Sequence, residues 1–412
     1  MLLKESTAVQ VPKNPELARD LDMAISKLLA YCRKEGWAGY DPYDALNSRL
    51  LRALPFAGTK WGRIALTQAL KRSPINFRPL LLVPKTQNPK SLALLIAAFL
   101  RLPPASLADR EELVQYLILR LNDLRSPDPS YWCWGYNFPW QGRENLVPRW
   151  AANMVCTTFV ADVLVDVFEK TQNSLALEMA ESAARYILER LYWSDHSGAG
   201  FSYPVPSLRS EVHNANLLGA ALFSRIYRHT GDERFREAAL TVARHAARKQ
   251  LQDGSWYYGE SPSQKWIDNF HTGYNLLALR TIERELNASD FRKNLVDGFT
   301  FYRTRFFRED SAPRYFHDRA YPIDIHCVAQ SILTLVAVKD LAPGCDALAE
   351  SVFRWSIAHM WDRRGFFYYR VLGYGTIRTS FMRWSQAWML LALSTLQASL
   401  ETRQAAGEVL PA

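Results

Sequence analysis

Cysteine is scarce in this sequence, and the few cysteines present follow no metal-binding or redox pattern. Only five occur in 412 residues, and no two of them form a CxxC pair. An HExxH motif is also absent. An odd number of widely spaced cysteines indicates a reduced, cytoplasmic chain without structural disulfides. We therefore expect no bound metal, and we interpret Cys133, Cys156 and Cys327 as small buried side chains.

Long apolar runs and glycine-rich loops are lacking as well. The longest dense apolar run, residues 92–100, is far shorter than the roughly 20 residues that a membrane-spanning helix needs. The first residues, MLLKESTAVQVPKNPE, contain no apolar stretch of signal-peptide length. No glycine-rich phosphate-binding loop occurs. These absences predict no membrane span and neither a nucleotide nor a dinucleotide cofactor.

The sequence is rich instead in aromatic residues and in positive charge. It contains 13 Trp, 19 Tyr and 20 Phe, and its formal net charge is +9. Lys and Arg are scattered rather than concentrated on one helix or tail, which argues against nucleic acid as a partner. The positive charge is either a solvated surface or a field that attracts an acidic ligand.

A repeat of about 58 residues organises the chain from residue 131 to residue 400. Five segments open with an aromatic residue or His and continue as a strongly apolar run of helical period. Aligned at Trp150, His213, His271, His326 and Trp384, they are spaced by 63, 58, 55 and 58 residues. The helices predicted between them have a narrow apolar stripe and a charged face. Because an apolar helix must be covered on all sides, the repeat predicts hairpins of one inner and one outer helix.

The two connections of each repeat differ in length and composition. Inner helices lead to outer helices through short polar turns, such as HTGDE at 229–233. Outer helices lead back through longer aromatic loops, which are typical of short β-hairpins. Four such loops are YWCWGYNFPW at 131–140, GAGFSYPV at 198–205, DGSWYYGE at 253–260 and RRGFFYYR at 363–370. Since they recur at one place in the repeat, we expect all of them on one face.

The predicted fold is all-α: a closed (α/α)6 or (α/α)7 toroid of helical hairpins, with short aromatic β-hairpin-like loops on one face. It forms a single domain over residues 1–412, in which residues 1–130 fit the repeat less regularly. Two further pairs are expected there, from segments 16–33, 43–54, 61–71, 91–102 and 110–124. An open helical solenoid is the alternative, but its inner helices would face solvent or a partner, whereas these are apolar all round.

This pattern resembles the α/α-toroid enzymes that act on sugars. They include six-hairpin glycosidases, unsaturated glucuronyl hydrolases, N-acylglucosamine epimerases, toroid polysaccharide lyases and the toroid domain of glucuronyl C5-epimerases. The sequence is also similar to proteins of bacterial polysaccharide biosynthesis around GYDPYDALNS at 39–48 and DNFHTGYNLLAL at 268–279. The architectural likeness covers nearly the whole chain, whereas the motifs are short and select no single member. The resemblance implies an oligo- or polysaccharide substrate, but a fold alone does not supply the reaction.

Three histidines occupy equivalent positions in successive repeats, where His213, His271 and His326 each open an inner helix. The N-termini of these helices direct positive dipole ends toward one face of the ring, which favours neutral imidazole, a competent base near neutral pH. Tyr274 lies one helical turn after His271 and would donate a proton to a leaving oxygen.

Carboxylates adjoin two of these histidines. Two carboxylates would serve glycosidic hydrolysis, two histidines an epimerase, and a His with a Tyr a lyase. An Asp just before an inner helix is equally suited to cap that helix. The candidate catalytic residues are His213, His271, His326, Tyr274, Asp268 and Asp324.

The aromatic loops and the polar residues beside them are expected to bind substrate. Trp and Tyr faces stack on sugar C–H surfaces, while amide and guanidinium groups bind hydroxyls and carboxylates. Each Arg could instead pair with a neighbouring acid, and alternation makes some aromatic residues of each loop pack inward. The candidate substrate-binding residues are Asp44, Trp134, Tyr136, Trp140, Arg143, Arg149, Asn214, Trp256, Gln330, Arg383 and Trp384.

The sequence thus predicts a carbohydrate-active enzyme of bacterial polysaccharide metabolism that acts on an acidic, uronate-containing glycan. Its reaction would be histidine-mediated proton abstraction, by an epimerase or a lyase, or glycosidic hydrolysis. The alternative is a non-catalytic glycan-binding or polysaccharide-assembly protein on the same toroid. The sequence favours no particular sugar, linkage or oligomeric state.

Overall fold

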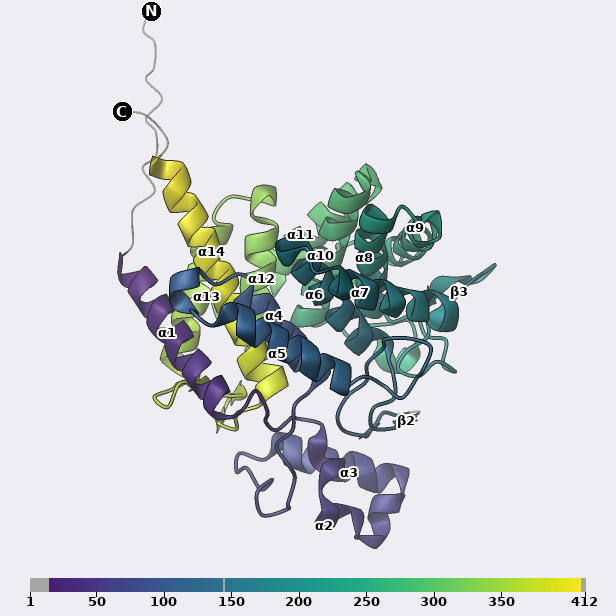
Figure 1. The fold of residues 1–412 in the computed structure, drawn as a ribbon. Coiled ribbons are helices and arrows are strands. Elements are labelled where there is room, and N and C mark those ends of the chain that lie inside the picture. Colours follow the sequence, from purple (N-terminus) through teal and green to yellow (C-terminus); the bar gives the residue numbers. More distant parts are fainter. Residues whose placement is uncertain (1–14, 144, 409–412) are drawn as a thin grey trace, which may run out of the picture.

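Six helices form a closed inner ring. The computed structural model describes residues 15–143 and 145–408. In chain order the inner helices are α4 (Pro89–Phe99), α6 (Met154–Thr171), α8 (His213–Thr230), α10 (Asn269–Leu286), α12 (Ile325–Ala337) and α14 (Trp388–Glu408). Each packs against the next, and α14 packs against α4, which closes the ring (Figure 1). The prediction of an α/α toroid is confirmed, and the described chain forms six hairpins.

The outer helices surround this ring. Five of them directly follow their inner partners: α5 (Arg110–Asp123), α7 (Ser174–Tyr186), α9 (Glu233–Arg248), α11 (Arg292–Arg305) and α13 (Cys345–Met360). The sixth, α1 (Pro15–Lys34), packs against α14, so this hairpin joins segments from opposite ends of the chain. The side-chain amide of Gln397 on α14 donates to Asp22 on α1 at 2.7 Å.

Local signals in the sequence start and end the inner helices. Four of them follow an N-cap side chain that accepts hydrogen bonds from backbone N–H groups of the first turn. These caps are Asn88, Asn153, Asp268 and Asp324. Three inner helices end on a residue in the left-handed conformation, which reverses the chain toward the outer helix. These residues are Gln172, Gly231 and Asn287, with φ of 57°, 69° and 50°.

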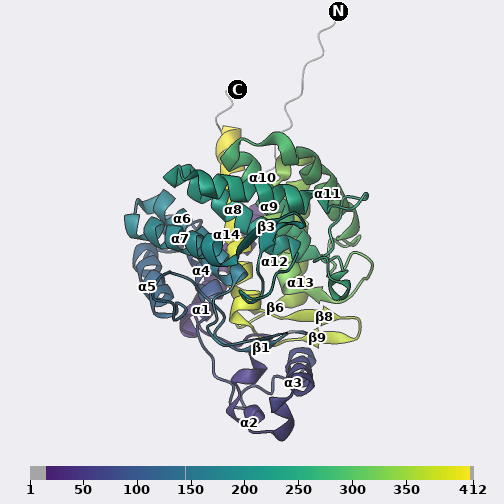
Figure 2. The same ribbon diagram turned by 90° about the vertical axis from the view of Figure 1, so that its right-hand side faces the viewer.

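Residues 39–88 leave the ring and form a separate layer, here called the capping segment. It contains the short helices α2 (Arg49–Arg52) and α3 (Lys60–Arg72). Figures 1 and 2 show both beyond the end of the ring at which the inner helices begin. The prediction that 43–54 and 61–71 supply ring helices is therefore wrong. Their apolar residues suffice only for a small separate core of Ala45, Leu51, Leu70 and Val83, and Trp61 remains 72% exposed.

The face of the ring at which the inner helices begin is here called the mouth, and short antiparallel strands lie on it. Three sheets have two strands each: β1 (Trp140–Gln141) pairs with β2 (Leu146–Val147), β3 (Tyr192–Asp195) with β4 (Gly198–Phe201), and β6 (Trp361–Asp362) with β7 (Phe366–Phe367). A fourth sheet has three strands, in which β8 (Arg370–Leu372) lies between β5 (Ile323–Asp324) and β9 (Gly375–Ile377). In Figure 2, β1, β8 and β9 lie between the helices and the capping segment. Of the four aromatic loops, 198–205 and 363–370 contain the expected strands. Residues 131–140 contribute only the start of β1, and 253–260 only an isolated bridge.

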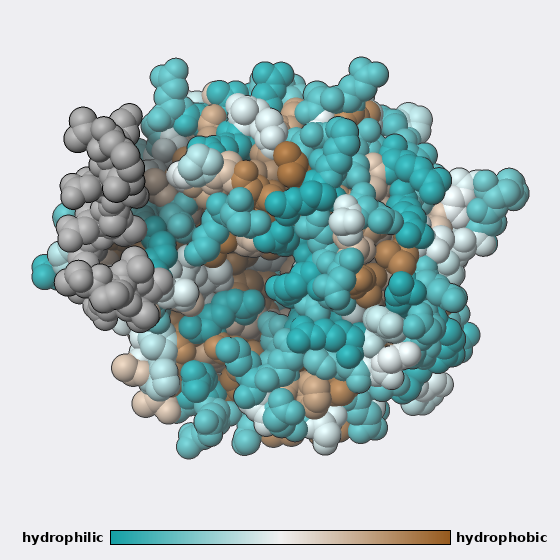
Figure 3. All heavy atoms as spheres, turned by 90° about the horizontal axis from the view of Figure 1, so that it is seen from above, coloured by the Kyte–Doolittle hydropathy of each residue, from teal (hydrophilic) through white to brown (hydrophobic). Residues whose placement is uncertain are grey.

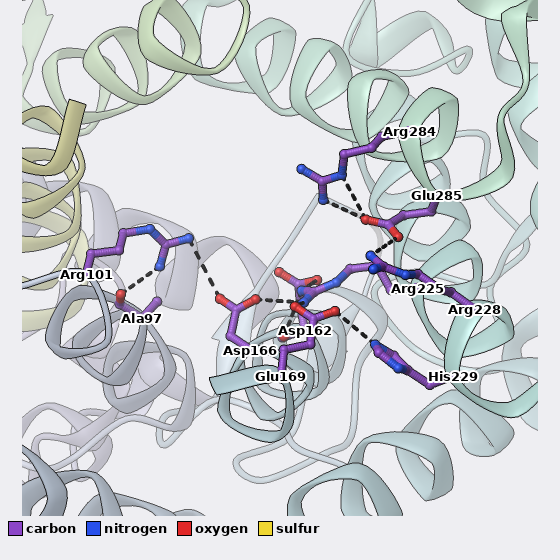
Figure 4. Close-up of polar contacts among 10 residues, drawn as sticks. All are labelled: Ala97, Arg101, Asp162, Asp166, Glu169, Arg225, Arg228, His229, Arg284 and Glu285. Carbon is purple, nitrogen blue, oxygen red and sulfur yellow. Dashed lines mark hydrogen bonds and ion pairs between the residues drawn. The ribbon is translucent and has the colours of Figure 1, made fainter. Parts of the chain in front are cut away.

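The end of the ring opposite the mouth carries a buried, compensated charge (Figure 4). The guanidinium group of Arg225 on α8 is 7% exposed and binds three carboxylates of α6. Asp162 lies at 2.6 Å, Asp166 at 2.7 Å and Glu169 at 2.9 Å. Burial lowers the pKa of Arg225, but these carboxylates outweigh it and raise the pKa overall, so the group stays charged.

A second ionic cluster lies beside the first. Glu285 on α10 accepts from Arg228 at 2.9 Å and from Arg284 at 2.6 Å. Figure 3, which views the molecule from this end, shows the centre of the ring as a hollow with hydrophobic atoms inside and hydrophilic atoms around it. Each guanidinium group of the two clusters thus has an acidic partner at the rim of this hollow.

The cysteines belong to the core. All five are buried and unpaired, which confirms the interpretation of Cys133, Cys156 and Cys327 as small buried side chains. Over residues 15–143 and 145–408, no helix combines the length and the apolar character needed to cross a membrane.

Candidate active site

The mouth brings together most of the predicted catalytic residues around the starts of α10 and α12. The ring of Phe270 links two histidines, with centroid distances of 4.1 Å to His271 and 4.6 Å to His326. His213, the first residue of α8, takes no part in these contacts. The structure therefore joins His271 and His326 and places His213 to one side.

His271 forms a carboxylate–imidazole pair with the N-cap of its own helix. Its Nδ1 lies 2.7 Å from Asp268 Oδ2. Asp268 is held in turn by the backbone N–H of His271 and the indole N–H of Trp266, each at 3.0 Å. The Asp268 side chain is 1% exposed, whereas that of His271 is 20% exposed. A carboxylate at Nδ1 keeps the proton there, so Nε2 presents its lone pair and can accept a proton.

Tyr274 and His326 form a second hydrogen-bonded pair, 2.6 Å apart between the hydroxyl oxygen and Nε2. Burial lowers the pKa of His326 well below 6.5, and nearby Lys90 and Arg383 lower it further. Burial also raises the pKa of Tyr274 well above 10. The pair is thus a neutral imidazole and a protonated phenol, in which Tyr274 can donate to His326.

Lys90 is a buried lysine that the sequence analysis did not find. It is the second residue of α4 and is 3% exposed. Within the described residues its Nζ has no carboxylate partner; it lies 3.7 Å from the ring centroid of Phe159, 5.3 Å from that of Trp388 and 5.5 Å from that of Tyr274. Burial lowers its pKa well below 10.5, and Arg383 adds to this shift. A buried amine without a counter-ion is costly, which points to a use for it.

Asp324 is fully occupied by structural partners. One carboxylate oxygen accepts from the backbone N–H of His326 at 3.0 Å and from the indole N–H of Trp384 at 2.9 Å. The other accepts twice from Arg370, at 2.9 and 2.6 Å, and the side chain is fully buried. Its assignment as a catalytic acid is therefore corrected: Asp324 caps α12 and orients Trp384. Asp268 is also a cap, but it remains coupled to His271.

Arg383 fastens the capping segment to the ring. It donates to both carboxylate oxygens of Asp41, at 2.7 and 2.9 Å, and the two side chains are 5% and 6% exposed. The backbone packs as closely, since a Cβ atom on Gly39 would lie 2.7 Å from that of Met382. Residues 39–41 of the GYDPYDALNS motif are thus a docking segment for 381–383. Arg383, predicted to bind substrate, is instead committed to Asp41.

Asp44 of the same motif is likewise committed. It accepts from Arg78 at 2.7 Å, and both side chains are buried. Burial raises the pKa of Asp44 to about 6, against the opposing effect of Arg78. Its expected contact with substrate is corrected because both carboxylate oxygens are occupied: the second accepts from the backbone N–H of Asp41 at 2.9 Å.

His213 supports the neighbouring loop. Its Nε2 lies 2.8 Å from Glu260 Oε1, and its side chain is 1% exposed. This hydrogen bond, with a smaller contribution from Lys265, holds the pKa of Glu260 at about 2. The backbone N–H of His213 donates to the carbonyl of Tyr258, whose ring centroid lies 4.6 Å from that of His271. The backbone and the side chain of His213 thus both contact the loop 253–260, through Tyr258 and Glu260.

Half-buried tyrosines surround this group. They are Tyr43, Tyr136, Tyr203, Tyr258 and Tyr315. Tyr136 lies under the Arg383 guanidinium group at 5.0 Å, and the Tyr315 ring contacts Phe270 at 5.7 Å. Burial raises the pKa of Tyr136, Tyr258 and Tyr315 well above 10. Their phenols remain protonated and can donate hydrogen bonds to sugar hydroxyls. Of these, Tyr136 was predicted as a substrate-binding residue and Tyr258 as part of the aromatic loop 253–260.

Lys71 approaches this aromatic group from the capping segment. Its Nζ lies 2.6 Å from the Tyr43 hydroxyl oxygen and 5.7 Å from the centroid of Trp384. Like Lys90, it has no carboxylate partner within the part of the chain that the structure describes. Two uncompensated lysines therefore lie near the Trp384–Trp388 turn, one on each side of the boundary between capping segment and ring.

Two predicted aromatic residues belong to the core rather than to the mouth. Trp134 and Trp256 are 0% and 1% exposed, and their indole N–H groups donate to the carbonyls of Leu121 and Ala246. An indole enclosed in this way offers no face to a ligand, so both substrate-binding assignments are corrected. Alternation in an extended loop directs every second side chain inward, and these two follow that direction.

The other predicted contacts are spread around the mouth. Trp140 is half-buried on β1 and Arg143 is exposed on the β1–β2 turn. Asn214 and Gln330 are buried within α8 and α12, each with a side-chain oxygen that lacks a partner. Arg149 lines a separate groove of about 490 Å³ near α5, away from the histidines.

No cluster suited to a metal ion occurs in the described chain. Nowhere in it do three or more His, Cys, Asp or Glu side chains converge as metal ligands would.

Comparison with known proteins identifies the fold. No family model and no curated protein matches the sequence. Among solved structures, a possible member of the GH105 family from Salmonella enterica serovar Paratyphi A aligns over 98% of this chain and 99% of its own, with a TM-score of 0.62 and 11% identity. An unsaturated glucuronyl hydrolase specific for heparin aligns over 95% of this chain and 98% of its own, with a TM-score of 0.61 and 11% identity.

An epimerase matches over a shorter stretch. The cellobiose 2-epimerase from Bacillus thermoamylovorans covers 76% of this chain and 87% of its own, with a TM-score of 0.59 and 12% identity. The structural neighbours of this protein are thus α/α-toroid carbohydrate-active enzymes. At these identities the likeness shows the fold and leaves the reaction to the site.

Proposed function

We propose that this protein is a carbohydrate-active enzyme of bacterial polysaccharide metabolism that removes the C5 proton of a uronate residue in an acidic glycan. The observation that carries the proposal is the Asp268–His271 pair. It combines a fixed Nδ1 proton with an Nε2 atom that has no partner in the described chain, on a side chain that remains 20% exposed at the mouth. This is the arrangement that a general base requires.

The neighbouring groups supply the other parts of such a reaction. As the base takes the C5 proton, negative charge develops on the uronate carboxylate, and a nearby ammonium group stabilises it. Lys90 is suited to this role because no carboxylate of the described chain neutralises it. Tyr274, protonated and bonded to His326, is suited to donate the compensating proton.

Two outcomes follow from this one step. In a lyase the C4–O bond breaks as the C5 proton leaves, and the leaving oxygen takes its proton from Tyr274. In an epimerase no bond to C4 breaks, and a second group on the opposite face, here Tyr274, delivers a different proton to C5. Hydrolysis by two carboxylates is less well supported, because Asp324, Asp41 and Asp44 are each bound by a guanidinium group.

The acidic substrate and the cellular location are parts of the proposal with separate support. Lys71 and Lys90 bring to the mouth two amines without a carboxylate partner in the described chain, and five half-buried tyrosines offer hydroxyl groups to a sugar. Five buried, unpaired cysteines support a reducing compartment, which for this chain we take to be the cytoplasm.

The test is proton NMR of the full-length protein in deuterated water with galacturonate, glucuronate and mannuronate oligosaccharides. A lyase produces a vinyl signal, and an epimerase exchanges the C5 proton for deuterium. We expect His271→Ala to lower the rate by a factor of about 10²–10⁴, since it removes the base. His359→Ala, on the exposed surface of α13, serves as the control and should keep the wild-type rate.

Either of two results would overturn the proposal. One is turnover that His271→Ala leaves unchanged. The other is ligand binding, seen as line broadening, with unchanged spectra across the whole panel, which would identify a glycan-binding protein without catalysis.

A further inference from the structure

A basic groove lies apart from the histidines of the candidate active site. It has a volume of about 720 Å³ and runs between α1, the start and end of the capping segment, and the β6–β9 region. Six cationic residues line it: Lys27, Lys34, Lys85, Arg363, Arg364 and Arg378. We call it the outer groove. Its size is within the range of pockets that hold a ligand.

The charge of the outer groove is largely uncompensated. Glu35 is the one carboxylate among the lining residues, and it binds Lys85. Arg364 is paired with Asp362 just outside the groove. The remaining four cations, all exposed, have no acidic partner within the described residues. Such an excess of like charge on one wall is unfavourable unless an anion offsets it.

The floor of the groove is aromatic rather than charged. Tyr31 packs on Phe366 with ring centroids 5.0 Å apart, and its hydroxyl donates to Ser380 at 2.9 Å. Tyr40 lines the groove as well, beneath Lys85. Aromatic rings beside hydroxyl groups suit a sugar, whose C–H face is apolar and whose edges are polar. The rings pack on one another rather than standing apart, which is a poor arrangement for stacking nucleic-acid bases.

The groove adjoins the candidate active site through a thin wall. Gly39, Tyr40 and Met382 line it, and the next residues along both segments are Asp41 and Arg383, which join the capping segment to the mouth. A polymer bound in the outer groove would therefore lie close to the mouth.

We propose that the outer groove binds an acidic glycan and holds a distant part of the same polymer whose uronate enters the mouth. The groove's role as a glycan site stands on its own charge and floor, while its link to the mouth rests on the proposed function. The ligand class is a polymer of carboxylated or sulfated sugars.

The test is fluorescence anisotropy of the full-length protein with a labelled long galacturonate oligosaccharide, at physiological ionic strength. The double variant Lys27→Glu/Arg378→Glu reverses two unpaired cations of the groove. The matched control, Lys170→Glu/Arg248→Glu, makes the same change of net charge at exposed positions of α6 and α9 that have no acidic partner in the described chain. We expect the groove variant to weaken binding about tenfold and the control less than twofold.

Galacturonate disaccharide separates this proposal from the previous one. It is too short to occupy both sites, so the groove variant should turn it over at the wild-type rate. If no uronate is turned over but the groove variant still binds the long oligosaccharide more weakly than the control does, the proposed function fails and the proposal of a glycan site in the groove remains. If disaccharide is turned over but both double variants bind the long chain equally, the groove proposal fails alone. If the protein bound single-stranded DNA more tightly than the long oligosaccharide, and the groove variant lost that binding, the groove would be assigned to nucleic acid instead.

Discussion

The two ends of the ring treat buried charge in opposite ways. At the far end, Arg225 is enclosed by three carboxylates, and the neighbouring arginines share Glu285. At the mouth, Lys90 is more deeply buried than Arg225 and has aromatic faces for neighbours instead of acids. Both ends use the same scaffold of inner helices. The difference supports the proposal that the mouth holds a ligand, because an uncompensated buried amine weakens the fold.

The largest effect on stability should come from removing Arg225 at the far end of the ring. Replacing Arg225 with Met leaves the partly exposed Asp162, Asp166 and Glu169 without their shared cation, which should lower the free energy of unfolding by about 3 kcal/mol. Urea denaturation measures this change. Arg228→Met is the control, because that side chain is 57% exposed and Glu285 keeps Arg284, so its effect should stay below about 1 kcal/mol. Equal effects of the two changes would remove the stabilising role assigned to Arg225.

A smaller loss is expected at the boundary between mouth and capping segment. Asp41→Asn removes the charge that faces Arg383 and keeps the shape, so we expect a loss of about 2–3 kcal/mol. The capping segment should detach before the ring unfolds, which limited proteolysis detects as early cleavage within residues 39–88. Cleavage that begins in the ring helices instead would show that Asp41 does not hold this segment in place.

The third change should have the opposite sign. Lys90→Met replaces an uncompensated buried amine with an apolar side chain of similar length, and should raise stability at pH 7 by about 1–2 kcal/mol while weakening uronate binding. The folded-state pKa of Lys90 is lowered, so the unfolded chain binds this proton more tightly and the destabilising contribution of Lys90 shrinks as the pH rises toward about 10.5.

Denaturation at pH 7 and at pH 9.5 tests this sign directly. The advantage of Lys90→Met over the wild type should shrink at the higher pH. Lys170→Met, at an exposed position, should change stability by less than about 0.5 kcal/mol at either pH. A Met variant that is less stable at pH 7 would mean that Lys90 stabilises the fold through its aromatic contacts.

The sequence predicted the repeating part of this molecule well, because each inner helix carries its own periodic signal. The apolar runs after His213, His271 and His326 are inner helices, and the short polar turns between hairpins lie where they were expected. The histidine register and the neighbouring Asp268 were also recognisable, since helix caps and helix starts are local features. Residues that lie within one repeat of each other were thus placed near their true partners.

Contacts between distant segments were beyond such reasoning. Asp41 and Arg383 are 342 residues apart, and nothing in either neighbourhood indicates the other. Lys90 escaped notice because α4 lies in the irregular first third, although Asn88 and Pro89 mark its start as a capped helix. The burial of Trp134 and Trp256 could not be distinguished from exposure either, since alternation shows that half of a loop faces inward without showing which half.

The pairing of α1 with α14 also determines when the ring can close during synthesis of the chain. Five hairpins contain only contacts between neighbouring stretches of chain and can fold as they leave the ribosome. The sixth joins the first helix to the last, and α14 must also fill the gap between α12 and α4. Until α14 emerges, the nascent protein is an open arc whose two apolar edges are exposed to chaperones and proteases. The ring can therefore close only after α14 has emerged.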